Sequence, residues 1–444
     1  MAPEDCDRLS DDDARILGLE SATITGHTLK LIVLEPGPDP FELDALRAAV
    51  AQRLPREPRA TQRVDTSGSE PRWVDATDFD ICHHVRRWAN PDCVSQADLW
   101  RAVSGLMSEH LDRERPLWVL DVIGPLGDGR VAIPARIHHA MADGIAGVRF
   151  LEAVLWDAHL NSQEGQDPQE LQDPKERPRP GLRSAPAAVR SRLADAWGMP
   201  GAVLRELGHP GSRSPFDRPI TASRELAFLV APLADVKAIG ASRPTRTTVN
   251  DVLLAIVAGG LRTWLGVGQT AAPHLHAQVP VSLHQRDEGA SDLGNRDSFI
   301  NVDLPLAETD PLVRLDRITA ETSVRKHLGD AEELYDLFHA LGRIKHVGTA
   351  VQRVAKSARE FSVSISNVPG PPSLITVAGH KVQHLFSSSE PAAHHALRIS
   401  AISCAGDIGI GLCTDPQALP DVARLAVAIE DSYAELRSAA MGTQ

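Results

Sequence analysis

The sequence is poor in cysteine and in aromatic residues, and it has no long uninterrupted apolar run. Its five cysteines are odd in number and scattered, without a Cys-x-x-Cys pair, which argues against a disulfide framework and against a zinc site. No stretch approaches the roughly 20 consecutive apolar residues of a membrane-spanning helix. The longest, Val252 to Leu261, is typical of a buried helix. Any membrane contact is therefore expected to be peripheral.

Positive charge is also scarce. The chain has 46 Lys and Arg against 59 Asp and Glu, a formal net charge of −13. Nucleic-acid backbones are bound by dense Lys and Arg, so this balance argues against a nucleic-acid partner. The first residues are acidic and lack the basic and then apolar order of a secretory signal, so we expect a protein of the reducing cytoplasm.

The length of 444 residues exceeds that of a usual single core, so two domains are expected. Between Asn161 and roughly Arg218 the composition changes to many prolines and charges with few large apolar residues, a pattern typical of a linker. We therefore divide the chain into an N-terminal half (1–160), a Pro-rich linker (161–220) and a C-terminal half (221–444).

One stretch in the N-terminal half combines strand, turn and helix signals around two adjacent histidines. Apolar residues alternate from Val131 to Ile137, which predicts a strand with one buried face. Spacings of three and four in the apolar residues that follow predict a helix that starts near Asp143. Adjacent residues leaving a strand point to opposite faces, so one histidine enters a given cavity and the other packs. We predict that His139 does the chemistry and that His138 supports it.

The chemistry indicated is general-base catalysis, since an imidazole with an ordinary pKa of about 6.5 accepts a proton near neutral pH. Asp143, one helical turn on, either braces the turn through an arginine or orients the imidazole. Gly144 leaves room for a substrate. The alternative is that the histidines are an ordinary core feature, because the chain has two further adjacent pairs, His83-His84 and His394-His395.

The segment from His138 to Gly144 resembles the HHxxxDG signature of a superfamily that includes chloramphenicol acetyltransferase, peptide-synthetase condensation domains and bacterial wax ester synthase/diacylglycerol acyltransferases. The surrounding segments are similar to those of the last family and follow the same order, from about Leu9 to about Leu436. These segments are Leu111–Trp118, Gly127–Arg130, Val249–Val252, Pro280–Ser282 with Gly294-Asn295, and Ser366–Pro371.

This resemblance implies an α/β (α+β) fold of two chloramphenicol-acetyltransferase-like halves that form a channel at their interface, with His139 near its middle. It implies transfer of an acyl group from acyl-CoA, as co-substrate, to a diacylglycerol or a long-chain alcohol, with no further cofactor and no metal. His139 would take the hydroxyl proton, without an acyl-enzyme. Asn250 would stabilise the oxyanion.

Other site residues are weighed against simpler roles. Thr248 opens a predicted helix that runs to Trp264, so Asn250 also fits helix capping. Asn367 begins a predicted turn, Asn367–Pro371, after a strand at Phe361–Ser366, and either crosses between the halves or only stiffens the turn. Glu20 matches an acidic residue of the family but equally fits a helix end. Either Arg286 or Arg296 would pair with Asp143. The chain departs from the family at Thr25–Thr28, where the family commonly has a Pro-Met-His-Val run.

Two alternatives remain. One is a condensation-type enzyme that uses carrier-bound acyl groups, although no carrier domain is recognisable. The other is an acyl-CoA-binding or lipid-binding protein without turnover. For an enzyme acting on lipids we expect reversible contact with a membrane or lipid droplet through the linker, whose arginines Arg190 and Arg192 lie near Trp197. The oligomeric state is left open.

Overall fold

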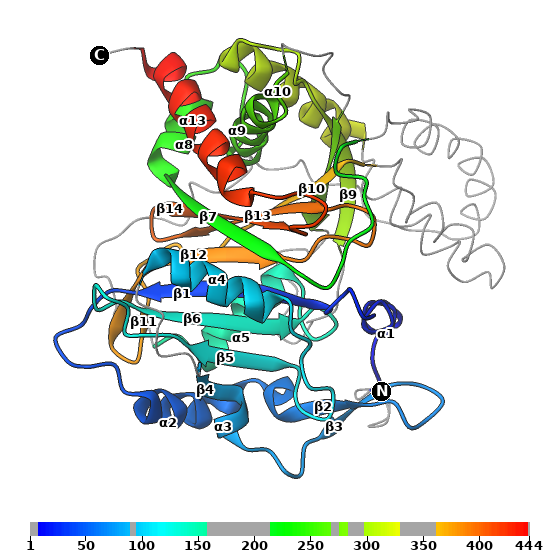
Figure 1. Ribbon diagram of the computed structural model, residues 1–444, viewed down its shortest axis with the longest axis vertical. Helices are drawn as coiled ribbons and strands as arrows, with labels where there is room; N and C mark the ends of the chain where they lie inside the picture. The colour runs from blue at the N-terminus through cyan, green and yellow to red at the C-terminus, as the bar shows by residue number, and fades with distance from the viewer. Residues whose placement is uncertain are drawn as a thin grey trace, which may run out of the picture.

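The computed structural model describes residues 8–88, 95–157, 214–267, 275–282, 297–328 and 361–442. It is a mixed α/β structure with two large sheets (Figure 1). Most of the predicted linker and its arginines therefore lie outside the described residues. Among the helices of the described part, none is long and apolar enough to cross a membrane.

The first sheet is built on the N-terminal half but takes two strands, β11 and β12, from the C-terminal half. Its strands are, in spatial order, β11 (Thr376–Val377), β12 (His380–Ser389), β1 (His27–Leu34), β6 (Val131–His138), β5 (Trp118–Val122) and β4 (Val85–Arg87). Only the pairing of β4 with β5 is parallel. The C-terminal stretch thus contributes to both sheets.

The second sheet lies wholly within the C-terminal half. Its order is β7 (Glu225–Pro232), β14 (Asp407–Thr414), β13 (Leu397–Cys404), β10 (Val363–Val368), β8 (Leu275–Ser282) and β9 (Asp297–Leu304). Strand β10 pairs in parallel with β13 and β8, and the other neighbours are antiparallel. A separate hairpin pairs β2 (Gln62–Asp65) with β3 (Arg72–Asp75).

Helices pack against both sheets. Those of the N-terminal half are α1 (Asp11–Leu17), α2 (Leu43–Arg53), α3 (Ile81–His84), α4 (Gln96–Met107) and α5 (Gly144–Val154), with short 3₁₀ turns at Leu54–Arg56 and Pro58–Thr61. Those of the C-terminal half are α8 (Leu233–Ala241), α9 (Val249–Trp264), α10 (Pro311–Leu328) and α13 (Val422–Met441). In Figure 1 the second group lies on the far side of the second sheet from the first sheet.

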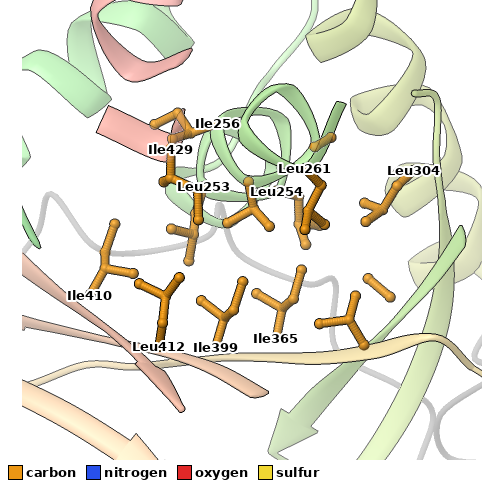
Figure 2. Close-up of a cluster of buried hydrophobic side chains, with 14 of the residues drawn as sticks. Leu253, Leu254, Ile256, Leu261, Leu304, Ile365, Ile399, Ile410, Leu412 and Ile429 are labelled. Carbon is orange, nitrogen blue, oxygen red and sulfur yellow. The ribbon is translucent and has the colours of Figure 1, made fainter. Parts of the chain in front are cut away.

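The core of the C-terminal half forms where α9 packs on the second sheet. Leu253 and Leu254 of this helix face Ile365, Ile399 and Leu412 of the strands (Figure 2). Every residue of α9 from Asp251 to Leu261 is buried, which confirms the prediction that this apolar run is a core helix rather than a membrane span.

Two sets of contacts join the halves. Strand β12 packs across β13 and β14, and the approach is so close that a Cβ on Gly409 would lie 2.0 Å from the carbonyl oxygen of Leu385. In addition, α4 covers the edge of β7. The hydroxyls of Ser104 and Ser108 accept hydrogen bonds from the backbone N–H groups of Leu226 and Arg224, at 3.0 and 2.9 Å. These bonds satisfy edge-strand donors that would otherwise be buried without partners.

We predict that Gly409→Ala destabilises the protein by about 1–3 kcal/mol, because β12 must move away from β14 to admit a methyl group. The unfolding midpoint in urea measures the effect. Gly105→Ala is the matched control. Nothing lies within 4 Å of its added Cβ in the last turn of α4, so this variant should gain up to about 1 kcal/mol. Equal midpoints for the two variants would contradict the packing argument.

Candidate active site

The two histidines lie at the turn from β6 to α5, as predicted. His138 is the last residue of β6 and is in register with His27 of β1. The ladder continues one step further, because the backbone N–H of His139 donates to the carbonyl oxygen of Gly26 at 2.8 Å. Alternation along the strand therefore turns the two imidazoles to opposite faces of the sheet.

His138 is fully buried, and both of its ring nitrogens are used. Nδ1 accepts a hydrogen bond from the backbone N–H of Ala140 at 3.0 Å, which places the proton on Nε2. Nε2 then donates to the carboxylate of Glu20, also at 3.0 Å. This imidazole has no lone pair left for a substrate proton, and its role is to hold the turn.

Glu20 is a structural partner of this turn. Its second carboxylate oxygen forms an ion pair with Arg113. Burial acts to raise the pKa of Glu20, but the hydrogen bond from His138, together with the charge and hydrogen bond of Arg113, holds that pKa below its ordinary value. The acidic residue singled out from the sequence therefore contacts the supporting histidine. It makes no hydrogen bond to His139 within the described residues.

The segment that departs from the family pattern, Thr25–Thr28, lies directly against the histidines. Gly26 has a φ of +74°, and a Cβ there would lie 2.3 Å from Nε2 of His138, so only glycine fits. The carboxylate of Glu390 accepts the backbone N–H groups of Gly26 and Thr25 at 2.6 and 2.9 Å. Sequence analysis missed Glu390, because it lies more than 360 residues along the chain from this segment.

The imidazole of His139 faces the other side of the sheet, where its pKa responds to the charges of Arg398 and Asp143. Burial lowers its pKa to about 4, and the positive charge of Arg398 acts in the same direction. Its backbone and the negative charge of Asp143 oppose that shift. The imidazole is therefore neutral at pH 7, which is the form that accepts a proton.

Asp143 caps helix α5. Its side chain is buried, and Oδ1 accepts the backbone N–H of Ala146 at 2.7 Å. Lys30, a buried lysine of β1 that no sequence prediction singled out although it interrupts an apolar strand, has its pKa lowered by burial to about 8, and the negative charge of Asp143 opposes that shift. Arg286 and Arg296, the predicted partners of Asp143, lie outside the described residues.

Gly144 is the first residue of α5, and the end of β10 packs against it. A Cβ on Gly144 would lie 2.9 Å from Cγ2 of Val368, so the space that this glycine leaves is filled by the protein. The segment after Ser366 thus does cross between the halves. The predicted strand end was wrong, however, because β10 continues through Asn367 and Val368. Alternation turns Asn367 to the face opposite Val368.

Asn250 lies in the first turn of α9, but it does not cap the helix. The hydroxyl of Thr248 accepts the N–H of Asp251, and the carboxylate of Asp251 accepts the N–H of Thr248, which completes a capping box. The Asn250 side chain is half-buried and makes no hydrogen bond within the described residues. No measured contact joins it to His139, so its role in catalysis stays a prediction.

Comparisons with known proteins agree with one another. The model of the wax ester synthase/diacylglycerol acyltransferase catalytic domain matches residues 9–253, and the model of that family's C-terminal domain matches residues 293–437. A probable diacylglycerol O-acyltransferase of Mycobacterium tuberculosis H37Rv, tgs1, is 30% identical over 91% of this chain and 90% of its own. A putative diacylglycerol O-acyltransferase of Mycobacterium bovis is 30% identical over 92% of this chain and 86% of its own.

Solved structures share the fold. The wax ester synthase/diacylglycerol acyltransferase from Marinobacter aquaeolei VT8 superposes with a TM-score of 0.71 at 23% identity and covers 98% of this chain and 99% of its own. The first condensation domain of the calcium-dependent antibiotic synthetase gives a TM-score of 0.61 at 15% identity, over 99% and 97% of the two chains. The predicted fold class is confirmed.

We predict that Glu20→Gln lowers the free energy of unfolding at pH 7 by about 1–2 kcal/mol, because a charged partner of His138 and Arg113 is lost. Since the pKa of Glu20 is lowered on folding, its contribution is present above the ordinary pKa and disappears as pH falls through the folded value. Thermal melts from pH 7 to about pH 3 measure this. The exposed Glu114→Gln is the control, and a constant difference across the range would contradict the assignment.

Proposed function

Because this chain belongs to the wax ester synthase/diacylglycerol acyltransferase family and is an acyltransferase enzyme, we propose that it transfers a fatty acyl group from acyl-CoA to a lipid hydroxyl. The acceptor class is a diacylglycerol or a long-chain alcohol. The observation that supports this most is the division between the histidines: His138 is saturated by Ala140 and Glu20, and His139 faces the other side as a neutral base.

In the proposed reaction, His139 accepts the proton of the acceptor hydroxyl as its oxygen attacks the thioester carbonyl carbon. The resulting tetrahedral oxyanion needs a hydrogen-bond donor, and Asn250 is our candidate. Collapse of this intermediate breaks the carbon–sulfur bond. The CoA thiolate leaves and receives the proton from the imidazolium of His139, which regenerates the base. No acyl-enzyme forms, because the acceptor oxygen attacks the thioester directly.

Asp143 favours the imidazolium that this reaction requires. Its negative charge raises the pKa of His139 against the larger effect of burial. The same carboxylate caps α5 by accepting the backbone N–H of Ala146. One side chain therefore both fixes the start of the helix after the turn and favours the protonated form of His139.

The lipid acceptor implies work at a membrane or lipid-droplet surface. Since the net charge of −13 is repelled by anionic headgroups, we propose that contact is local and peripheral. The arginine-containing linker remains our candidate for this contact.

We predict that His139→Ala lowers kcat by about 10²- to 10⁴-fold with little change in melting temperature, the usual effect of losing a general base. Acyl transfer from radiolabelled acyl-CoA to diacylglycerol and to hexadecanol measures it. His138→Ala is the matched comparison. It removes the bond to Glu20 and should lower the melting temperature more. Turnover near the wild-type value in His139→Ala would refute the assignment.

The pH dependence gives a second prediction. The acid limb of kcat/KM reports the base of the free enzyme. Burial lowers the pKa of His139 to about 4, so the limb should be centred near that value rather than near 6.5, and kcat/KM should be flat from about pH 7 to about pH 5.5. Circular dichroism checks that the protein is folded over the range. A limb centred near 6.5 would show that another group, or an exposed histidine, is the base.

A further inference from the structure

Glu390 belongs to the C-terminal half, but its side chain reaches the segment that precedes β1. It is the first residue after β12, and its Oε1 accepts the backbone N–H of Gly26 at 2.6 Å. Its Oε2 accepts the backbone N–H and the hydroxyl of Thr25, at 2.9 and 3.2 Å. The exposed fraction of the Glu390 side chain is 11%, so these charge-assisted bonds form largely away from water. One carboxylate therefore fixes two consecutive peptide units ahead of the first strand.

Gly26 is the residue through which this segment meets the histidine turn. Its carbonyl oxygen accepts the backbone N–H of His139 at 2.8 Å. Its Cα lies against the imidazole of His138, since an added Cβ would come within 2.3 Å of Nε2. Two hydrogen bonds in series thus lead from the carboxylate of Glu390 to the backbone of the proposed base, with one residue between them.

The Glu390 side chain takes over where the backbone pairing of β12 with β1 ends. Strand β12 lies between β1 and the second sheet (Figure 1), and its ladder with β1 ends at the pair of Thr28 and Ser389. On the other side of β1, the bond between Gly26 and His139 continues the ladder with β6. Loss of the carboxylate would therefore leave the strands paired and loosen the segment that carries Gly26.

Arg224 in turn fixes the position of Glu390. This arginine directly precedes β7, and its side chain is fully buried. Its Nη2 lies 3.4 Å from Oε2 of Glu390 and also donates to the carbonyl oxygen of Thr23. Its Nη1 donates to the carbonyl oxygens of Thr221 and Ser223, at 2.6 and 2.9 Å. The guanidinium thereby ties the carboxylate to the start of β7, a strand of the second sheet.

We propose that Glu390 is a positioning residue for acyl transfer. By holding Gly26, it sets the backbone position of His139 and hence the direction from which the imidazole accepts the proton. This inference rests on the proposed function, in which His139 is the base, and adds that the C-terminal half aligns that base. A general base must lie within hydrogen-bond reach of the hydroxyl that it deprotonates, and a misplacement of about 1 Å costs on the order of 100-fold in rate. The effect of Glu390 should therefore appear in kcat rather than in KM.

The test measures kcat, both KM values and the melting temperature. The donor is palmitoyl-CoA, and the acceptor is whichever of diacylglycerol and hexadecanol the wild type uses faster. We expect Glu390→Ala to lower kcat by about 10- to 100-fold with both KM values unchanged. Glu390→Gln keeps one acceptor oxygen and should lower kcat less. A folded Glu390→Ala protein with the kcat of the wild type would overturn the proposal.

Asp157 provides the matched control, because its carboxylate accepts the same three kinds of donor as that of Glu390. It accepts the backbone N–H of Gly379 and the hydroxyl of Thr376, both at 2.9 Å, and a guanidinium N–H of Arg53 at 2.7 Å. It also joins the two halves, but it follows α5 at the end of that helix away from the histidine turn. Asp157→Ala should lower the melting temperature and leave kcat unchanged. An equal loss of kcat in both variants would overturn the specific role of Glu390.

A double-mutant cycle shows whether Glu390 acts through His139. In the His139→Ala background the base is already lost, so Glu390→Ala should lower the residual kcat by no more than about twofold. A full multiplicative loss in the double variant would overturn the proposal. If Glu390→Ala does not fold, Glu390→Gln replaces it in the cycle, and a wild-type kcat in that variant is then the contradicting result. Turnover near the wild-type value in His139→Ala would instead refute the proposed function.

Discussion

The close packing of β12 against the second sheet is the contact on which the site depends. Strand β12 pairs with β1 while its backbone occupies the space where Gly409 would carry a Cβ. Because β1 pairs in turn with β6, the position of β12 fixes how far the histidine turn lies from β10 and β13. A side chain at position 409 would push β12 away from β14 without touching either histidine.

Two consecutive histidines at a strand end have different roles because the backbone separates their environments. On one face, His138 is bonded to the carboxylate of Glu20 and to the backbone N–H of Ala140, and these two bonds set its tautomer and ring orientation. The other face gives His139 burial and a nearby cation, which lower its pKa, and one carboxylate that opposes them. The strand thereby places a rigid support and the proposed base at neighbouring positions, without a separate loop for either.

Local sequence patterns predicted the strand, turn and helix that carry the histidines, but not the contacts that distant segments make with them. Alternation from Val131 to Ile137 and the helical spacing after Asp143 placed the histidines at a turn, and Thr248 was correctly placed at the start of α9. No local pattern shows that β12 joins the first sheet or that Glu390 holds Gly26, because both depend on contacts between distant segments. Lys30 carried a signal, a charge inside an apolar strand, but only the three-dimensional structure shows that it is buried and bonded to Ser387 of β12.

The electrostatics of the site limit how strong a base it can contain. Burial lowers the pKa of His139 to about 4, so the neutral form is available at every physiological pH but holds a proton weakly. Such a base abstracts a proton efficiently only if the imidazolium is stabilised as it forms, which is the role that we propose for Asp143, whose charge raises the pKa of His139.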